Sequence, residues 1–275
     1  MNLDDWKPVR RNTSRYLLDL EAYVQEFLPW SLREATPRSA EAEAAMQEAA
    51  QQIAERMVAR VAKTNVTSWR AAAAQRHNGR RIYAALREEL RAAVDFRLRQ
   101  IIARNAALIV SLPDRLAQQT AFYIASEQRR GLRSEAIAKK LVARLPEMRK
   151  SVVKRLARTE VAKAETALTQ ARAERLGLPW YEWATSEDAR VRPSHRKMDK
   201  ILVAWADAPA PEQLAGEASR LGHYHPGGAP NCRCLALPLV DLGEVAWPHR
   251  IYAHGTVTRV SLREFEKFAG LPLAA

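Results

Sequence analysis

A chain of 275 residues is long enough for one large or two modest domains, and we expect two. It carries 44 Lys and Arg against 31 Asp and Glu, so its formal net charge of +13 favours polyanionic partners, with nucleic acid first among them. A solvated basic surface without a partner would give the same balance. The N-terminus has no signal-peptide pattern, and the longest apolar stretch, residues 106–112, is too short to span a membrane. We therefore expect a protein kept inside the cell, without membrane contact.

The first 39 residues are rich in aromatic and aliphatic side chains, but Pro8 and Pro29 interrupt them. Because the apolar spacing looks irregular, we expect residues 1–39 to form an arm that docks on a partner.

Residues 40–177 are predicted to form a helical domain, because they are poor in Gly and Pro and carry apolar residues at helical spacing. Two stripes are expected to face the core: Met46, Ala50, Ile53, Met57 and Val61, and then Ile82, Leu86, Leu90, Val94, Leu98 and Ile101. A further helix with Leu116, Phe122 and Ile124 is expected after residues 112–114. A short helix from Ser134 to Pro146 and a long one from about Met148 to Leu176 complete the domain.

After Gly177 the pattern changes to short strands and loops. Residues 180–185, 201–206 and part of 231–240 read as strands, so residues 178–240 are predicted to form a small α+β domain. Residues 241–275 look like an extension with a strand at 256–260 and a helix at 262–269. The predicted fold class is α+β, with a mainly helical N-terminal and middle region.

Four motifs follow one another in the order GLRSEAIAKKL, LARTEVAKAETALTQARAE, WATSEDARVRPSHRKMDK and HPGGAPNCRC. Across roughly residues 113–240 this series resembles the minor head proteins of tailed phages, the head morphogenesis family that includes the Mu F-like proteins. The residues that match the family pattern are Arg158, Thr159 and Glu160, then Asp188, Arg190, Arg192 and His195, and finally Asn231, Cys232, Arg233 and Cys234. Some relatives carry a Cys-x-x-Cys pair where this chain has RPSH, which counts against a four-cysteine metal site.

Glu160 lies at the edge of an apolar helical stripe, where a carboxylate needs a partner. Arg190 or Arg192 is the expected bidentate partner, while Thr159 is expected to hydrogen-bond back to its own helix.

Cys232 and Cys234 are the only cysteines, and a disulfide between residues so close together would be strained. With His195 and either His225 or His223 they offer the mixed nitrogen and sulfur ligands of a tetrahedral zinc site. Buried structural thiols and a Cys-His nucleophile are the alternatives. If the NCRC segment is a strand, both sulfurs face one side and meet His195, while Arg233 faces the other.

The resemblance implies a minor head protein of a tailed phage or prophage, present in few copies near the portal and without enzymatic activity. Such a protein assists procapsid assembly and contacts DNA during packaging or ejection. The implied partners are the portal protein, the major capsid or scaffolding protein, and double-stranded DNA bound without sequence preference. The implied location is the virion, at the capsid interior or portal vertex, after assembly in the host cytoplasm. The alternatives are a zinc-dependent hydrolase or transferase using Glu160, His195 and the cysteines, and a free DNA-binding protein.

Overall fold

The computed structural model describes residues 9–32, 38–74 and 93–269. Contacts divide the chain into two compact units, of which the first contains Met1–Val9, Ala62–Arg97 and Ala162–Ala275, and the second Arg10–Val61 and Leu98–Val161. We call them the sheet unit and the helical unit. The unit boundaries fall inside long helices, and the domain boundaries expected at residues 39, 177 and 240 remain predictions. Along the described stretches, no helix is both long and apolar enough to cross a bilayer.

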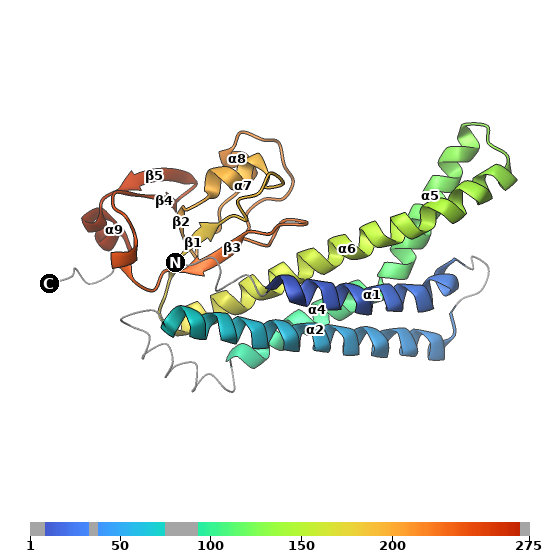
Figure 1. Cartoon of the computed structure of the whole chain (residues 1–275), viewed down its shortest axis with the longest axis horizontal. Coiled ribbons are helices and arrows are strands. Elements are labelled where there is room, and N and C mark those ends of the chain that lie inside the picture. The colour runs from blue at the N-terminus through green and yellow to red at the C-terminus, as the bar shows by residue number, and fades with distance from the viewer. Residues whose placement is uncertain (1–8, 33–37, 75–92, 270–275) are drawn as a thin grey trace. The chain divides into compact units, whose positions relative to one another are not determined.

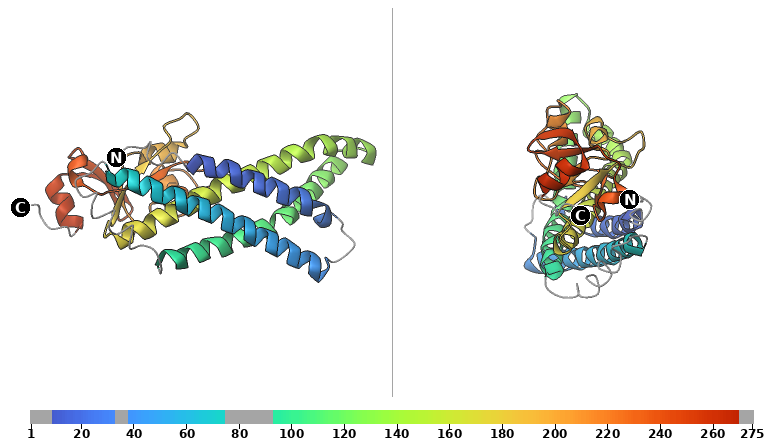
Figure 2. Two further views of the ribbon diagram at one scale, coloured as in Figure 1. Left: turned by 60° about the horizontal axis from the view of Figure 1, so that its bottom comes forward. Right: turned by 90° about the vertical axis from the view of Figure 1, so that its left-hand side faces the viewer.

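The helical unit contains α1 (Val9–Ser31) and α5 (Leu112–Arg129), with most of α4 (Ala93–Val110) and the first parts of α2 (Ala40–Ala74) and α6 (Ser134–Arg175). Helices α1 and α2 run side by side (Figures 1 and 2). The Tyr23 hydroxyl of α1 donates to the Met46 carbonyl of α2 at 3.2 Å. All five residues of the first predicted stripe are buried: Met46, Ala50, Ile53, Met57 and Val61. That stripe is confirmed as a core face.

Only part of the second stripe lies among the described residues. Residues 82–90 lie outside the described part of the chain, and Ile101 is buried. The helix expected with Leu116, Phe122 and Ile124 is confirmed as α5. Leu116 is fully buried, whereas Phe122 is 75% exposed and lies on the surface.

Two findings concern helix limits. Residues 9–31, whose apolar spacing looks irregular in the sequence, form the helix α1 with Tyr16, Leu20 and Val24 fully buried along one face, and a docking role for this segment stays a prediction. Helix α6 does not end at Pro146 but continues through it from Ser134 to Arg175. Pro146 is exposed, so the carbonyl that it leaves without an N–H donor is accessible to water.

The sheet unit is built on five strands in the order β3-β1-β2-β4-β5. They are β1 (Trp180–Ala184), β2 (Leu202–Ala204), β3 (Leu235–Pro238), β4 (His249–Ala253) and β5 (Thr256–Val260). The β2–β4 pair is parallel and the other pairs are antiparallel. Short helices α7 (Pro193–Met198) and α8 (Pro211–Leu214) lie together beside the sheet (Figure 1). The α+β class is confirmed.

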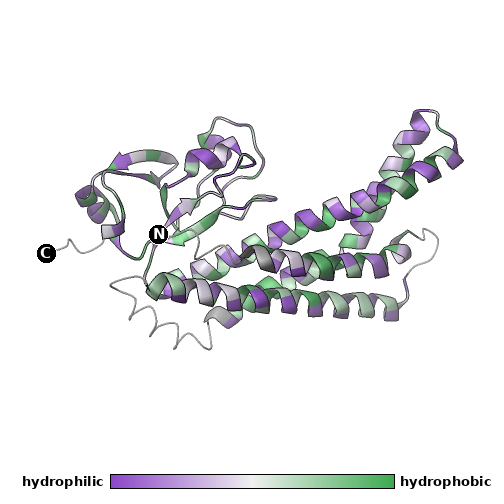
Figure 3. Ribbon diagram, viewed as in Figure 1, coloured by the Kyte–Doolittle hydropathy of each residue, from purple (hydrophilic) through white to green (hydrophobic). Residues whose placement is uncertain are grey.

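Each face of the sheet has its own core, because side chains alternate along every strand. Tyr181, Trp183, Val203 and Tyr252 face a cluster that includes Trp69 and Ala73 of α2 and Ala173 of α6. Trp180, Leu202 and Ile251 face Phe265 of α9 (Leu262–Ala269) on the other side. In Figure 3 the helices and strands both carry alternating green and purple segments, as expected for amphipathic elements with one buried face.

Residues 241–275 were expected as an extension, and their strand at 256–260 and helix at 262–269 are confirmed. The structure adds β4, which pairs with β2, so these residues complete the same sheet. The third strand begins only at Leu235, after the NCRC segment, which is a turn followed by irregular chain. The expectation that Cys232 and Cys234 lie in a strand is therefore wrong.

Candidate functional site

The loop of residues 225–231 is held against α6 by two close contacts. The Thr166 hydroxyl donates to the Pro226 carbonyl at 2.6 Å. Gly227 has φ of +82°, and a Cβ there would lie 2.8 Å from the Ala162 carbonyl oxygen. Only glycine accepts both that backbone conformation and that approach. The Pro-Gly-Gly sequence thus allows the loop to pack closely on α6, and this packing positions the NCRC segment in the core.

The RPSH turn reaches the same core from the other direction. It follows β1. The Asp199 carboxylate, at the end of the turn, accepts from the Thr185 N–H and hydroxyl at its start, both at 2.8 Å. The Arg192 guanidinium donates to the Pro230 carbonyl at 2.9 Å. These contacts turn His195, on α7, inward, where it is 2% exposed.

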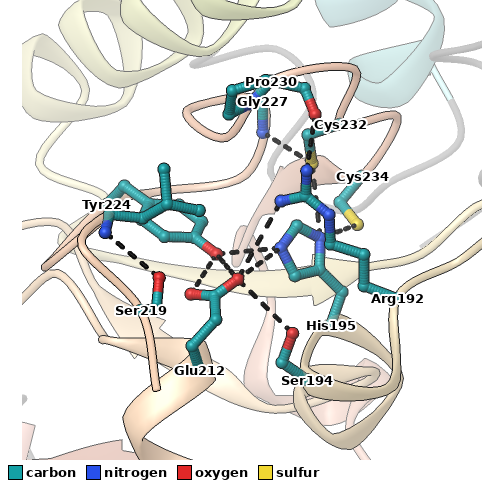
Figure 4. Close-up of polar contacts among 11 residues, drawn as sticks. Arg192, Ser194, His195, Glu212, Ser219, Tyr224, Gly227, Pro230, Cys232 and Cys234 are labelled. Carbon is teal, nitrogen blue, oxygen red and sulfur yellow. Dashed lines mark hydrogen bonds and ion pairs between the residues drawn. The ribbon is translucent and has the colours of Figure 1, made fainter. Parts of the chain in front are cut away.

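His195 meets both cysteines through one ring nitrogen (Figure 4). Its Nδ1 lies 3.5 Å from the Cys232 Sγ and 3.4 Å from the Cys234 Sγ. The Gly227 N–H donates to the Cys232 Sγ at 3.3 Å. The cysteines are 6% and 3% exposed, so the cluster is closed to bulk water. The predicted meeting of His195 with both sulfurs is present, although no strand carries them.

The other ring nitrogen of His195 has a polar partner whose role can be assigned. The Tyr224 hydroxyl lies 2.9 Å from the His195 Nε2 and 2.7 Å from both Glu212 carboxylate oxygens. A phenol has one proton, and the carboxylate can only accept it, so the Tyr224 oxygen accepts from an Nε2–H. Burial, reinforced by the hydrogen bond to Glu212, raises the pKa of Tyr224 and keeps the phenol protonated. The Nδ1 lone pair of His195 therefore faces the sulfurs.

Glu212 is buried on α8 and has further polar neighbours. The Ser194 hydroxyl lies 3.4 Å and an Arg192 guanidinium nitrogen 3.9 Å from its Oε1. Sequence reasoning missed Glu212, Tyr224 and Ser194 as members of the site. Tyr224 stands beside the quoted HPGG motif, but a single Glu in a Pro-rich stretch gives no signal of its own.

The two thiols are electrostatically unequal. The pKa of Cys232 is lowered, mainly by a hydrogen bond from the Cys234 thiol. The pKa of Cys234 is raised, because it donates to Cys232 and is buried. Cys232 is therefore the more acidic of the two thiols.

Arg233 points to a different partner from the cysteines beside it. Its guanidinium forms a bidentate pair with Asp188, with one contact of 2.6 Å from Nη2 to Oδ1 and a second to Oδ2. Asp188 also accepts from the Arg190 N–H at 2.9 Å. The Arg233 guanidinium holds the pKa of Asp188 well below its usual range. The NCRC segment and the turn that begins at Asp188 are thus joined twice, by Arg233 and by the cysteine–histidine cluster.

Two further histidines considered as metal ligands do not join the cluster. The His225 Nδ1 lies 2.9 Å from the Tyr181 hydroxyl, and the ring packs against Trp205. Burial lowers the pKa of His225. The His223 Nδ1 instead lies 2.8 Å from the Ala208 carbonyl oxygen, near the surface. The four-ligand set that includes either residue is not assembled here.

The remaining motif residues are placed as follows. Glu160 is buried and pairs with Arg104 of α4 at 3.2 Å, which replaces the expected pairing with Arg190 or Arg192. The Thr159 hydroxyl donates to the Arg155 carbonyl at 2.8 Å, as predicted. Arg158 is half-buried on α6, and both it and Glu160 belong to the helical unit. Asn231 supplies a left-handed turn, with φ of 57°, directly before Cys232.

The fold and site define an α+β protein in which a long helix leads into a mixed sheet closed by an Asp-Arg pair and a cysteine–histidine cluster. Residues 123–237 match the family described as phage Mu protein F like protein, and the resemblance to Mu F-like phage head proteins is confirmed over this stretch. A stretch of 147 residues is 32% identical to an uncharacterized protein of Haemophilus influenzae, covering 52% of this chain and 30% of that protein. The chain thus spans less than a third of that relative's length. No solved structure matches the chain.

Proposed function

We propose that this protein is a minor head protein of a tailed phage or prophage, incorporated in few copies near the portal. The observation that carries the proposal is the Mu protein F-like match over residues 123–237. In this proposal the protein assists procapsid assembly together with the portal and the major capsid or scaffolding protein. It then remains in the virion, at the capsid interior or portal vertex, where it contacts the packaged DNA.

A basic face on α6 supports the DNA contact. Between residues 139 and 155, six basic side chains are exposed, and at about 100° per residue they fall within about 160° of arc. They are Lys139, Lys140, Arg144, Lys150, Lys154 and Arg155. Lys140 pairs with Glu127 at 2.8 Å, and the Arg144 guanidinium lies 5.0 Å from the ring centre of Tyr123. Glu147 is an exposed acid within the same arc, so the face is predominantly but not entirely positive. An excess of positive charge along one helix suits the regularly spaced phosphates of a duplex.

The chemistry of the cluster does not favour a second, enzymatic function. His195, Cys232 and Cys234 are all less than 10% exposed, which leaves a substrate little access. The Cys-His contact and the orienting Glu212 would suit a nucleophile only if the surrounding loop opened. A structural use of these residues needs no such movement.

Portal association is the direct test. The chain is produced together with the portal protein encoded in the same phage or prophage, and portal rings are isolated by sedimentation. We expect the chain in the ring fraction, and a few copies per particle when intact heads are analysed by quantitative mass spectrometry. Heads that lack the chain, with portal rings that never retain it, would contradict the proposal. Production of the chain without the portal protein gives the sedimentation control.

A further inference from the structure

We propose that His195, Cys232 and Cys234 bind one zinc ion, which fastens the NCRC segment to the RPSH turn. The lone pairs of His195 are the first support for this site. The neutral imidazole offers the sulfurs one lone pair, at Nδ1, because Nε2 carries the proton given to Tyr224. One S–H donor satisfies that lone pair. A second sulfur at 3.4–3.5 Å from the same atom is explained by a cation held among all three atoms.

The distances agree with tetrahedral coordination. Zinc lies about 2.0–2.1 Å from a histidine nitrogen and about 2.3 Å from a thiolate sulfur. At a tetrahedral angle these bond lengths place nitrogen and sulfur about 3.5 Å apart. The observed separations from the His195 Nδ1 are 3.5 Å to Cys232 and 3.4 Å to Cys234, and all three ligand atoms lie within 4.8 Å of one another. The two nitrogen–sulfur separations therefore match those of a tetrahedral zinc site.

The surroundings of the cluster are those of a metal site. Metal-bound histidines usually donate their second N–H to a carboxylate or another acceptor, which fixes the tautomer and the ring orientation. Tyr224 and Glu212 supply that arrangement for His195 (Figure 4). The Gly227 N–H donates to the Cys232 sulfur and stabilises negative charge there. Two thiolates and an imidazole are ligands that suit zinc, whereas magnesium and calcium prefer oxygen.

Zinc binding exchanges one metal ion for two protons. Zn²⁺ displaces the protons of the Cys232 and Cys234 thiols and takes the free lone pair of His195, which leaves a neutral Zn(thiolate)₂(imidazole) centre. Among the residues that the structure describes, no fourth His, Cys, Asp or Glu joins these three. The fourth position falls to a water molecule. The ion joins segments 37 and 39 residues apart in the chain, and its role is structural.

The test measures metal in the full chain. The protein is purified without chelator, loaded with Zn²⁺, desalted, and analysed by inductively coupled plasma mass spectrometry. We expect close to one zinc per chain. With Co²⁺ in place of zinc, we expect the thiolate-to-cobalt charge-transfer absorption and the intense visible bands of a tetrahedral cobalt–sulfur centre. Both readouts use the unmodified protein, so neither depends on whether a variant folds.

Matched variants locate the site. Cys232→Ser combined with Cys234→Ser should abolish binding, while His225→Asn, which changes a half-buried histidine outside the cluster, should retain it. Tyr224→Phe keeps the ring but removes the acceptor for the His195 N–H, and should weaken zinc affinity about 10- to 100-fold. A loaded wild-type protein without stoichiometric metal, or a cobalt spectrum without the sulfur band, overturns the proposal. Full metal retention by the double serine variant overturns it as well.

Discussion

Gly227 is the residue on which the position of the NCRC segment depends most directly. Its φ of +82° is uncommon for any residue with a side chain. A Cβ at this position would also clash with the backbone of Ala162. Gly222 has a similar φ of +65° but has no atom within 4 Å of the place where a Cβ would lie. Substitution of Gly222 therefore tests backbone strain alone, whereas substitution of Gly227 tests backbone strain together with steric overlap.

We predict that Gly227→Ala destabilises the protein more than Gly222→Ala. Gly222→Ala should cost about 1 kcal/mol, because it introduces only the left-handed backbone conformation of a residue with a Cβ. Gly227→Ala should cost a further 1–3 kcal/mol or so, because the loop must move away from α6. Urea unfolding followed by circular dichroism measures both. Equal losses for the two variants would mean that the loop is not pressed against the helix.

Glu165 is a buried acid with an incomplete set of partners. Its Oε1 accepts from the Asn65 amide at 2.6 Å, and its Oε2 has no hydrogen-bond partner among the described residues. Asn65 also donates to the Thr169 hydroxyl at 2.8 Å and accepts from Arg172. Burial raises the pKa of Glu165 from 4.5 to about 7. The folded chain therefore holds a proton that the unfolded chain has released at intermediate pH.

We predict that the free energy of unfolding falls as pH rises from 4.5 to about 7 through the contribution of Glu165. In that window the unfolded state binds fewer protons than the folded state, so raising the pH favours unfolding. Below this pH range Glu165 is neutral in both states. Above it Glu165 is ionised in both states, and the folded state bears the full cost of a buried charge. Over the window the penalty is on the order of 3 kcal/mol. Glu165→Gln should remove this dependence, measured by urea unfolding at pH 5 and pH 8. An unchanged pH profile would show that Glu165 is ionised at its usual pKa.

At the scale of elements, periodicity explains which helices could be predicted. The stripe from Met46 to Val61 was recognised because its apolar residues are cleanly spaced and most exposed positions between them are polar. The stripe of α1 was missed because Leu18, 65% exposed, adds apolar character to the solvent-facing side. Pro146 suggested a helix end, but an exposed proline can be tolerated inside a long helix that is held by packing on either side of it.

We predict that α1 is an integral part of the helical unit. Leu20→Ala removes a fully buried side chain and should destabilise the protein by about 2–5 kcal/mol. Leu18→Ala, two residues away on the same helix, should change stability by less than about 0.5 kcal/mol. Thermal unfolding of the two variants compares them directly. A Leu20→Ala variant as stable as the wild type would instead favour a docking arm.

The candidate site shows where sequence reasoning stops. The meeting of His195 with both cysteines could be predicted from the motifs, since the short spacing of the cysteines limits where they point. The partner of Glu160 could not, because Arg104 is 56 residues away and is brought near by helix packing alone. The roles of Glu212 and Tyr224 could not be predicted either. Tyr224 contacts both His195 and Glu212 only because separate segments of the chain pack together in the fold.

At the scale of the whole molecule, the net charge of +13 predicts duplex binding that is independent of sequence. The logarithm of the binding constant should fall linearly with the logarithm of the salt concentration, by about 0.9 for each phosphate neutralised. Lys150→Gln combined with Lys154→Gln on the basic face of α6 should lower that slope by about 2. Replacing Arg259 and Lys267, exposed in the sheet unit, with Gln provides a control of equal charge. Fluorescence anisotropy with unrelated duplexes measures the slopes, and equal slopes for both variants would exclude the α6 face.

Because β2 pairs with β4, a stable fragment of this protein must extend beyond the region of sequence similarity. The matched region ends at residue 237, before β4 begins at His249. A polypeptide cut at residue 240 would leave β2 as an open edge and uncover Trp180 and Leu202, which pack against Ile251 and Phe265 in the intact chain. Such edges recruit strands from other molecules. Fragments of this protein designed from the similarity alone should therefore aggregate, as light scattering would reveal, whereas those that continue to residue 269 should stay dispersed.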